Sequence, residues 1–292
     1  MATQVLLDPG VPDLAALGAP AAEAWLEGFE APGGELVTSD GGREVRRVPL
    51  PGTLSGRPRG AGTGWVLWIR YGPAALAERL FARFTHPRSD SLAGREWNLF
   101  CALRRAGVAT PAPLALVWEE HPLFAPRSAL VTRALEGATP LEAWFARAGD
   151  PARRRRACTA LGLALARMGA AGIDLPLAPG RLLLLEDEDP TRPASPADAC
   201  GLEQVLAARR APVDVGRPVR WRRLPEVVVA DARGGRIRRH PTTRRLVARL
   251  ARDPGAADLG PDERRRVARA AAGNPGERRA LLATPSCWNV PE

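Results

Sequence analysis

The side chains that could act as nucleophiles or hold a metal are few in this chain and widely separated. Its four cysteines and three histidines share no paired spacing, so neither a zinc site nor a disulfide framework is expected. They are Cys101, Cys158, Cys200, Cys287, His86, His121 and His240. The chain also contains no lysine, so all 42 basic residues are arginine. Schiff-base chemistry, a Walker-type phosphate loop and the usual lysine of protein kinases are therefore excluded.

Carboxylates and arginines remain as the groups that could do chemistry. Asp231 follows the apolar run Val227–Ala230 and precedes two glycines, where it either caps a turn or contacts a cation or an arginine. Four consecutive arginines, Arg153–Arg156, form either a solvated helix face or a patch for phosphate or acidic lipid. The formal charge of +10 indicates an anionic partner, such as a phosphorylated ligand, an acidic lipid surface or nucleic acid.

The elements that must position these groups change in type along the chain. In the first half, strand patterns occur at residues 35–38, 44–50, 65–71, 114–119 and 128–132, and helix patterns at 21–29, 73–84 and 91–105. In the second half, helices are predicted at 153–171, 195–210, 242–251, 262–272 and 275–282, and strands at 182–185 and 227–230. The sequence Thr139-Pro140-Leu141-Glu142 predicts a capped helix start. A β-rich front, a helical back and a break near 134–138 predict an α+β protein in two lobes.

No segment has the pattern of a secretion signal or a membrane anchor. Residues 1–10 lack a basic stretch followed by an apolar one. The longest apolar stretch, 157–173, is interrupted by Arg167 and is short for a bilayer span. We therefore expect a cytoplasmic protein, with arginine patches that allow a peripheral position at the inner face of the membrane.

Two segments carry a resemblance to a known family. In residues 91–115, SLAGREWNLFCALRRAGVATPAPLA, a helix bearing Glu96 leads through a Gly-hydrophobic-x-x-Pro-x-Pro turn into a strand. Residues 227–237, VVVADARGGRI, place Asp231 between a strand and two glycines. Both segments resemble the lipopolysaccharide kinase (Kdo/WaaP) family, which has a protein-kinase-like fold, and the resemblance spans about residues 43–252.

The resemblance implies an organisation in two lobes and a reaction. Residues 1–30 would be an N-terminal extension, 31–133 a β-rich N-lobe, and 134–292 a helical C-lobe with an insertion at about 186–224. The implied reaction is phosphoryl transfer from ATP, assisted by Mg²⁺, to a sugar of the lipopolysaccharide core.

The resemblance also implies roles for single residues. Glu96 takes the place of the glutamate that orients the phosphate-binding lysine, and the lysine itself would fall at Ile69 or its neighbour Arg70. Asp231 takes the place of the metal-binding aspartate, with Asp214 as a rival alignment. We therefore expect Arg70, Glu96 and Asp231 to form the cofactor-binding set, Asp231 to hold the metal, and Arg70 to approach Glu96.

The catalytic loop departs from the family pattern. The family's histidine near Gly169, its aspartate near Leu177 and its Asn or His near Gly180 are all missing. Asp174 lies three residues before the expected aspartate and could act as a catalytic residue with Asp231 only if the loop is shifted.

The sequence therefore predicts a degenerate kinase with weak or no phosphoryl transfer. Two alternatives stay open. One is an active ATP-dependent sugar kinase that uses Arg70, Asp174 and Asp231 in altered roles. The other is an arginine-rich binding module for nucleic acid or an acidic membrane.

Overall fold

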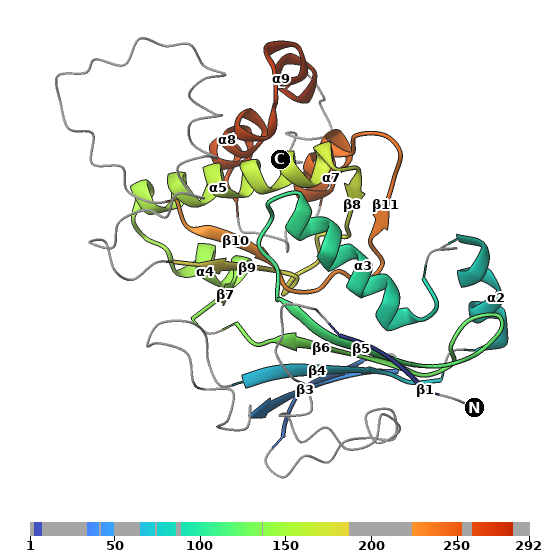
Figure 1. Cartoon of the computed structure of the whole chain (residues 1–292). Helices are drawn as coiled ribbons and strands as arrows, with labels where there is room; N and C mark the ends of the chain where they lie inside the picture. Colours follow the sequence, from blue (N-terminus) through green and yellow to red (C-terminus); the bar gives the residue numbers. More distant parts are fainter. Residues whose placement is uncertain are drawn as a thin grey trace.

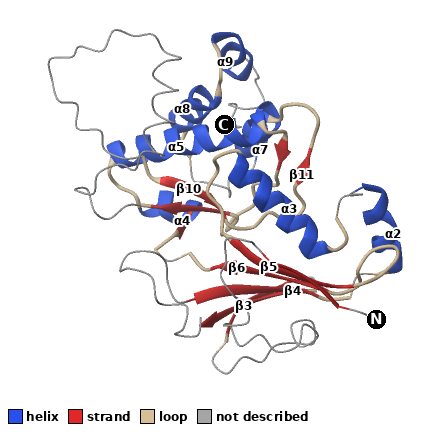
Figure 2. Ribbon diagram, viewed as in Figure 1, coloured by secondary structure: helices blue, strands red, loops and turns tan. Residues whose placement is uncertain are grey.

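The computed structural model describes residues 3–7, 34–40, 42–49, 65–73, 75–85, 89–135, 137–186, 224–252 and 259–282. Its strands gather mainly at one end and its helices at the other (Figures 1 and 2). The helices expected at 21–29 and 195–210, and the rival residue Asp214, lie outside the described residues.

Within these residues, the front half forms a six-stranded antiparallel sheet with the strand order β1-β5-β6-β4-β3-β2. The strands are β1 (Thr3–Leu7), β2 (Glu35–Asp40), β3 (Arg43–Pro49), β4 (Trp65–Tyr71), β5 (Pro113–Glu119) and β6 (Ser128–Arg133). Side chains of a strand alternate between the faces of a sheet. In β4, Ile69 and Tyr71 belong to the main core, whereas Val66 and Trp68 belong to a smaller apolar cluster.

The first strand differs from the expected N-terminal extension. Thr3–Leu7 pairs with β5 and forms one edge of the sheet. This pairing covers backbone groups of β5 that would otherwise be unpaired at a sheet edge. The segment therefore contributes to the same sheet as the predicted strands.

Two helices accompany this sheet. The helix α2 (Leu76–Thr85) precedes α3 (Leu92–Arg105), and α3 lies between the sheet and the helical end of the molecule (Figure 1). The start of α3 is fixed by two serines. Ser91 caps the helix by accepting a hydrogen bond from the backbone N–H of Gly94 at 2.9 Å, and Ser128 of β6 accepts one from the N–H of Ala93 at 3.1 Å.

The second half is mainly helical and also contains two small sheets. Its helices are α4 (Leu141–Arg147), α5 (Pro151–Ala170), α7 (Thr243–Arg252), α8 (Pro261–Ala271) and α9 (Pro275–Leu282). Its strands are β7 (Thr139–Pro140), β8 (Ile173–Asp174), β9 (Leu182–Leu185), β10 (Glu226–Val229) and β11 (Arg236–Ile237). They form a sheet of order β10-β9-β7 and a separate pair of β11 with β8.

Packing of α5 against α8 depends on a glycine. A Cβ added at Gly162 of α5 would overlap the side chain of Ala270 and the carbonyl of Val267. Only a residue without a side chain therefore allows the two helices to approach so closely.

The predicted helix cap at Thr139 is wrong. Thr139 and Pro140 form β7, the helix begins at Leu141, and no side chain caps it. Glu142 accepts a hydrogen bond from the N–H of Gly180 at 2.8 Å. The reason is a tertiary one, because pairing of β7 with β9 takes the two residues that would have started the helix.

The large sheet does not continue into the second half. It ends with β6 at Arg133, and the next strand, β7, pairs with β9 in a different sheet. The predicted α+β arrangement, with a β-rich N-terminal part followed by helices, is confirmed. In the described residues no helix is long and apolar enough to cross a membrane.

Candidate functional site

Glu96 lies at the point where α3, the sheet and the segment after β10 meet. Its side chain is 2% exposed. One carboxylate oxygen accepts hydrogen bonds from Nη2 of Arg43 at 3.4 Å and from the N–H of Ala232 at 3.3 Å. The other accepts a hydrogen bond from the hydroxyl of Tyr71. Glu96 thus links β3, β4 and the residue that follows Asp231.

The expected approach of Arg70 to Glu96 is wrong, because a different arginine occupies that position. Nη2 of Arg70 instead lies 2.7 Å from the carboxylate of Glu44, its direct neighbour on β3. Side chains alternate along β4, so Arg70 points to the face opposite Tyr71. The strand pairing aligns Arg43 with Tyr71, which brings Arg43 to the Glu96 face.

Arg43 was missed by reasoning from the sequence. A local signal exists, since Asp40-Gly41-Gly42 immediately before it is a typical hairpin turn. β2 pairs with β3 with Asp40 opposite Arg43. The contact with Glu96, however, depends on the pairing of β3 with β4, two strands that are separated in the sequence by residues 50–64.

Charge and burial oppose each other in this cluster. Burial raises the pKa of Glu96 and outweighs the opposing effect of Arg43. Burial alone would lower the pKa of Arg43, but Glu96, Tyr71 and Asp231 together raise it. Burial and the neighbouring Glu96 also raise the pKa of the Tyr71 hydroxyl. Arg43 is therefore charged, and ionisation of Glu96 costs more free energy here than it does in water.

Asp231 lies beside this cluster and is held by its own neighbour. Its two carboxylate oxygens each accept a hydrogen bond from Arg233, one from the backbone N–H and one from Nε, both at 2.8 Å. Burial would raise the pKa of Asp231, but the charge of Arg43, the N–H of Arg233 and the charges of Arg181 and Arg233 lower it. Asp231 therefore stays ionised.

The implied Mg²⁺ would have to compete with Arg233 for Asp231. Both oxygens of Asp231 are occupied by Arg233. Among the described residues, no three His, Cys, Asp or Glu side chains gather closely enough to hold a metal. Mg²⁺ prefers an octahedral set of oxygen ligands with one or two carboxylates free to bind it.

Arg43 contributes a buried donor that lacks a partner. Its Nε atom is buried and has no hydrogen-bond partner within the described structure. A cavity of about 330 Å³ adjoins the cluster, lined by Arg43, Glu96, residues 232–236 and side chains of α2 and α3.

Comparison with known proteins bears on the family and on the fold. Residues 74–175 match the model of the lipopolysaccharide kinase (Kdo/WaaP) family. The solved structure of WaaP in complex with acyl carrier protein has a TM-score of 0.58 and 20% sequence identity, over 97% of this chain and 93% of that chain. The resemblance to the Kdo/WaaP family is confirmed.

Two further comparisons add little. The structure of aerobactin synthetase IucC from Klebsiella pneumoniae has 11% identity and a TM-score of only 0.32, over 74% of this chain and 45% of that chain. That score is too low to indicate a shared fold. A search of curated protein sequences finds no match.

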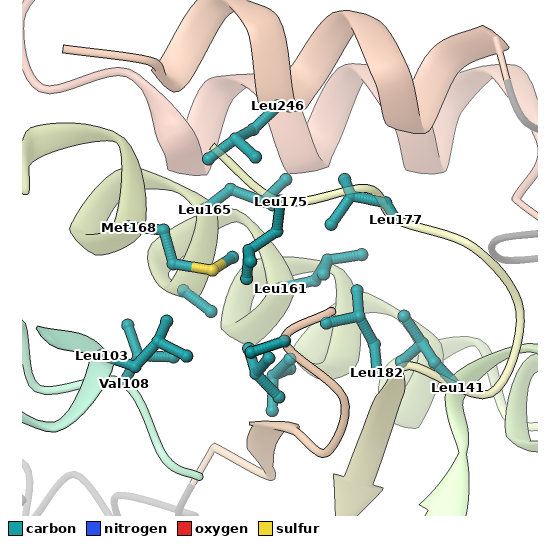
Figure 3. Packing of buried hydrophobic residues seen from close by; sticks show 14 of the residues in the cluster. Leu103, Val108, Leu141, Leu161, Leu165, Met168, Leu175, Leu177, Leu182 and Leu246 are labelled. Carbon is teal, nitrogen blue, oxygen red and sulfur yellow. The ribbon is translucent and has the colours of Figure 1, made fainter. Parts of the chain in front are cut away.

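Leu177, the residue that the resemblance places at the family's catalytic aspartate, is an apolar core residue. Leu177 is 4% exposed and belongs to the main apolar cluster. Figure 3 shows it among leucines of α5 and β9, together with Leu175 from the same segment. Burial of these leucines holds the loop in place without a carboxylate.

Asp174, the candidate substitute for this aspartate, lies in a cluster of arginines. Its side chain is 2% exposed, and Oδ2 accepts a hydrogen bond from Nε of Arg238 at 2.7 Å. Oδ1 lies 2.6 Å from Nη1 of Arg249, and Arg245 approaches to 3.9 Å. A catalytic role for Asp174 stays a prediction, and these contacts indicate that it stabilises the fold.

Proposed function

We propose that this chain is a kinase-like protein of the Kdo/WaaP type that has lost efficient phosphoryl transfer and binds nucleotide weakly. The observation that carries the proposal is the burial of Leu177 where the family needs a carboxylate. A kinase aspartate at this place orients the acceptor hydroxyl and accepts its proton. An isobutyl group does neither.

The state of the two nearby aspartates supports the same proposal. Asp231 is bound at both oxygens by Arg233, and Asp174 by Arg238 and Arg249. A carboxylate that already neutralises guanidiniums would have to give up these contacts before it could bind a metal or accept a proton. Asp174 is 2% exposed, so loss of its arginine partners would leave a buried carboxylate unpaired, which is unfavourable.

Arg43 is the residue through which we propose that nucleotide binds. It supplies a cation beside Glu96, in the role that the family gives to a lysine, but from the neighbouring strand. Its planar guanidinium is already engaged with Glu96 through Nη2, and its Nε is buried, so little of the group is left for a phosphate oxygen. We therefore expect weak binding of ATP that depends little on Mg²⁺.

The experiment tests transfer and binding separately. Purified protein is incubated with labelled ATP, Mg²⁺ or Mn²⁺ and lipopolysaccharide-core sugars, alongside Asp231→Asn, Asp174→Asn and the exposed control Asp262→Asn. The proposal expects no transfer above background in any of them. Robust transfer that is lost in Asp174→Asn would show instead an active kinase with a shifted loop.

Binding is measured as the rise in melting temperature on adding ATP. The proposal expects a small rise that Arg43→Gln abolishes and that Arg105→Gln, an exposed arginine of α3, leaves intact. If ATP has no effect and the protein binds anionic vesicles or nucleic acid in a salt-sensitive way, the arginine-rich binding module is favoured.

A second candidate function is peripheral binding to an anionic membrane, and α2 is the observation that favours it. Four large apolar side chains of this helix are exposed: Leu76, Leu80, Phe81 and Phe84. Three of them recur every four residues, so they share one face. An apolar face on a protein of net charge +10 suits the surface of an acidic bilayer.

Co-sedimentation with vesicles tests this second function. Binding to phosphatidylglycerol but not phosphatidylcholine vesicles is expected, and Phe84→Ser should weaken it several-fold. The control is Leu123→Ser, which removes an exposed leucine outside α2. Equal effects of the two substitutions would count against a role of α2.

The arginine run Arg153–Arg156 offers less free positive charge for membrane binding than its composition suggests, because Arg153 pairs with Glu186 and Arg154 with Glu263.

A further inference from the structure

The segment that follows Asp231 is the most basic part of the described chain. Between Asp231 and Asp253 the sequence has no carboxylate, and it has eight arginines: Arg233, Arg236, Arg238, Arg239, Arg244, Arg245, Arg249 and Arg252. Excess positive charge of this density repels itself unless it is neutralised by the protein or by a bound anion.

The protein neutralises only part of this charge. Asp174 approaches three of the arginines, Arg238, Arg245 and Arg249, with a single negative charge. Arg236 and Arg239 are exposed, and no carboxylate of the described residues pairs with either of them. The segment therefore keeps a local excess of cations.

These cations are held on a fixed loop. The N–H of Arg238 donates to the carbonyl of Gly172 at 2.8 Å, and the N–H of Thr242 donates to that of Gly169 at 2.9 Å. The hydroxyl of Thr242 also donates to the carbonyl of Ile173 at 2.6 Å. Residues 238–242 thus form an arch whose two ends are hydrogen-bonded to the C-terminal end of α5 and the strand after it.

Two glycines make this attachment possible. A Cβ at Gly169 would overlap the backbone and side chain of Thr243, and one at Gly172 would overlap the carbonyl of Arg238. Gly172 also has φ of +70°, which other residues rarely adopt. The arch therefore lies directly on the end of α5, and the backbone that carries its arginines is held in place.

A cavity of about 460 Å³ lies on this arch. It is lined by residues 236–242 and Arg245, and four of these eight residues are arginines. None of the lining residues is acidic. We propose that this cavity binds a small ligand that carries a phosphate group. The proposal goes beyond the proposed function, because it involves neither Arg43 nor Glu96 nor Asp231. Arg236 lines both cavities, so Arg239→Gln is the variant that separates the two sites.

The chemistry of the lining selects the ligand. Guanidinium groups bind phosphate oxygens through paired, charge-assisted hydrogen bonds, and a phosphate dianion offsets more of the excess charge than a carboxylate does. Ile237 and Pro241 line the same cavity and provide a small apolar surface for the part of the ligand that bears the phosphate. A phosphorylated sugar has both features.

Isothermal titration of the full chain tests the proposal with pyrophosphate, glucose 1-phosphate and glucose. The variants are Arg236→Gln and Arg239→Gln, separately and together, since neither side chain supports Asp174. The matched control is Arg278→Gln, which removes one exposed positive charge from α9. The melting temperature of each variant shows that the fold is intact.

We expect binding of both phosphates and none of glucose. Each single substitution should weaken binding about tenfold, as loss of a charge-assisted hydrogen bond does, and Arg278→Gln should change it less than twofold. Absence of phosphate binding at millimolar concentration, or equal loss in Arg278→Gln, would overturn the proposal. Binding to phosphatidic acid vesicles without binding to either soluble phosphate would also overturn it, because the site would then be a lipid surface.

Discussion

Among single residues, Glu96 has the contacts that connect most of the candidate site. It is a buried carboxylate whose partners come from two strands and from the segment after Asp231. The position of Glu96 can be predicted from the sequence, because the helical spacing of α3 is visible there. The identity of its partner cannot, because Arg43 reaches Glu96 only through the register of β3 with β4. The site thus pairs a buried carboxylate of α3 with an arginine of β3.

The first prediction concerns the pH dependence of stability. Burial raises the pKa of Glu96 above its ordinary value of 4.5, so the folded protein holds this proton more tightly than the unfolded chain does. The resulting stabilisation is fully present below about pH 4.5 and is lost as pH rises through the folded pKa. Each pKa unit corresponds to about 1.4 kcal/mol.

Urea unfolding from pH 4.5 to 7.5 measures this contribution by comparing the wild type with Glu96→Gln. The free energy of unfolding of the wild type, minus that of the variant, should fall as pH rises. Asp231 titrates in both proteins, so its own contribution largely cancels. A difference that stays constant, or rises with pH, would show that the carboxylate is better solvated than its burial indicates.

A second prediction at this scale concerns Cys158. Burial raises the pKa of its thiol to about 12, so at pH 8 only about one molecule in ten thousand carries the thiolate. In a variant whose other three cysteines are serine, the thiol should not react with Ellman's reagent until the protein is unfolded. A matched variant that keeps only the half-buried Cys101 should react faster. Rapid reaction of native Cys158 would contradict its burial in α5.

At the scale of an element, much of the secondary structure was predictable from the sequence. The residues of β4 and β9 match their predicted ranges, because short apolar runs between turn residues leave little choice of boundary. The elements that were missed are β1, β7, β8 and β11, which owe their existence to pairing with distant strands. The arginine cluster on Asp174 was missed for the same reason.

The third prediction tests how α5 supports the arch of residues 238–242. Gly169→Ala should lower the free energy of unfolding by about 1–3 kcal/mol or more, because the added Cβ overlaps Thr243. Gly149→Ala is the matched control, since a Cβ there meets no atom within 4 Å. Urea unfolding of the two variants measures the difference. Equal stability would mean that the arch is not attached to α5 as described.

In the molecule as a whole, one apolar core joins the large sheet to the helical second half of the chain. The main cluster contains Val45 and Leu130 from the large sheet, Leu99 and Leu103 from α3, and residues of α4, α5, α7, α8 and α9. A Cβ at Gly235 would lie 3.1 Å from Leu99, so α3 also packs directly on the segment after Asp231. The site cluster and the core therefore connect the same elements, and the sheet cannot lose its packing on α3 without disturbing the helical part.

The last prediction follows from this shared core. Unfolding should be a single cooperative transition in which tryptophan fluorescence and far-UV circular dichroism change together. Leu103 is fully buried on α3, and Leu103→Ala should lower the midpoint of both signals equally, with a loss of about 2–5 kcal/mol. Leu123→Ala, at an exposed position, should leave both midpoints nearly unchanged. Two separated transitions, or a shift of only one signal in Leu103→Ala, would show that the sheet and the helical part unfold independently. In that case the contacts of Glu96 with Arg43 and Ala232 would not be strong enough to couple the two parts.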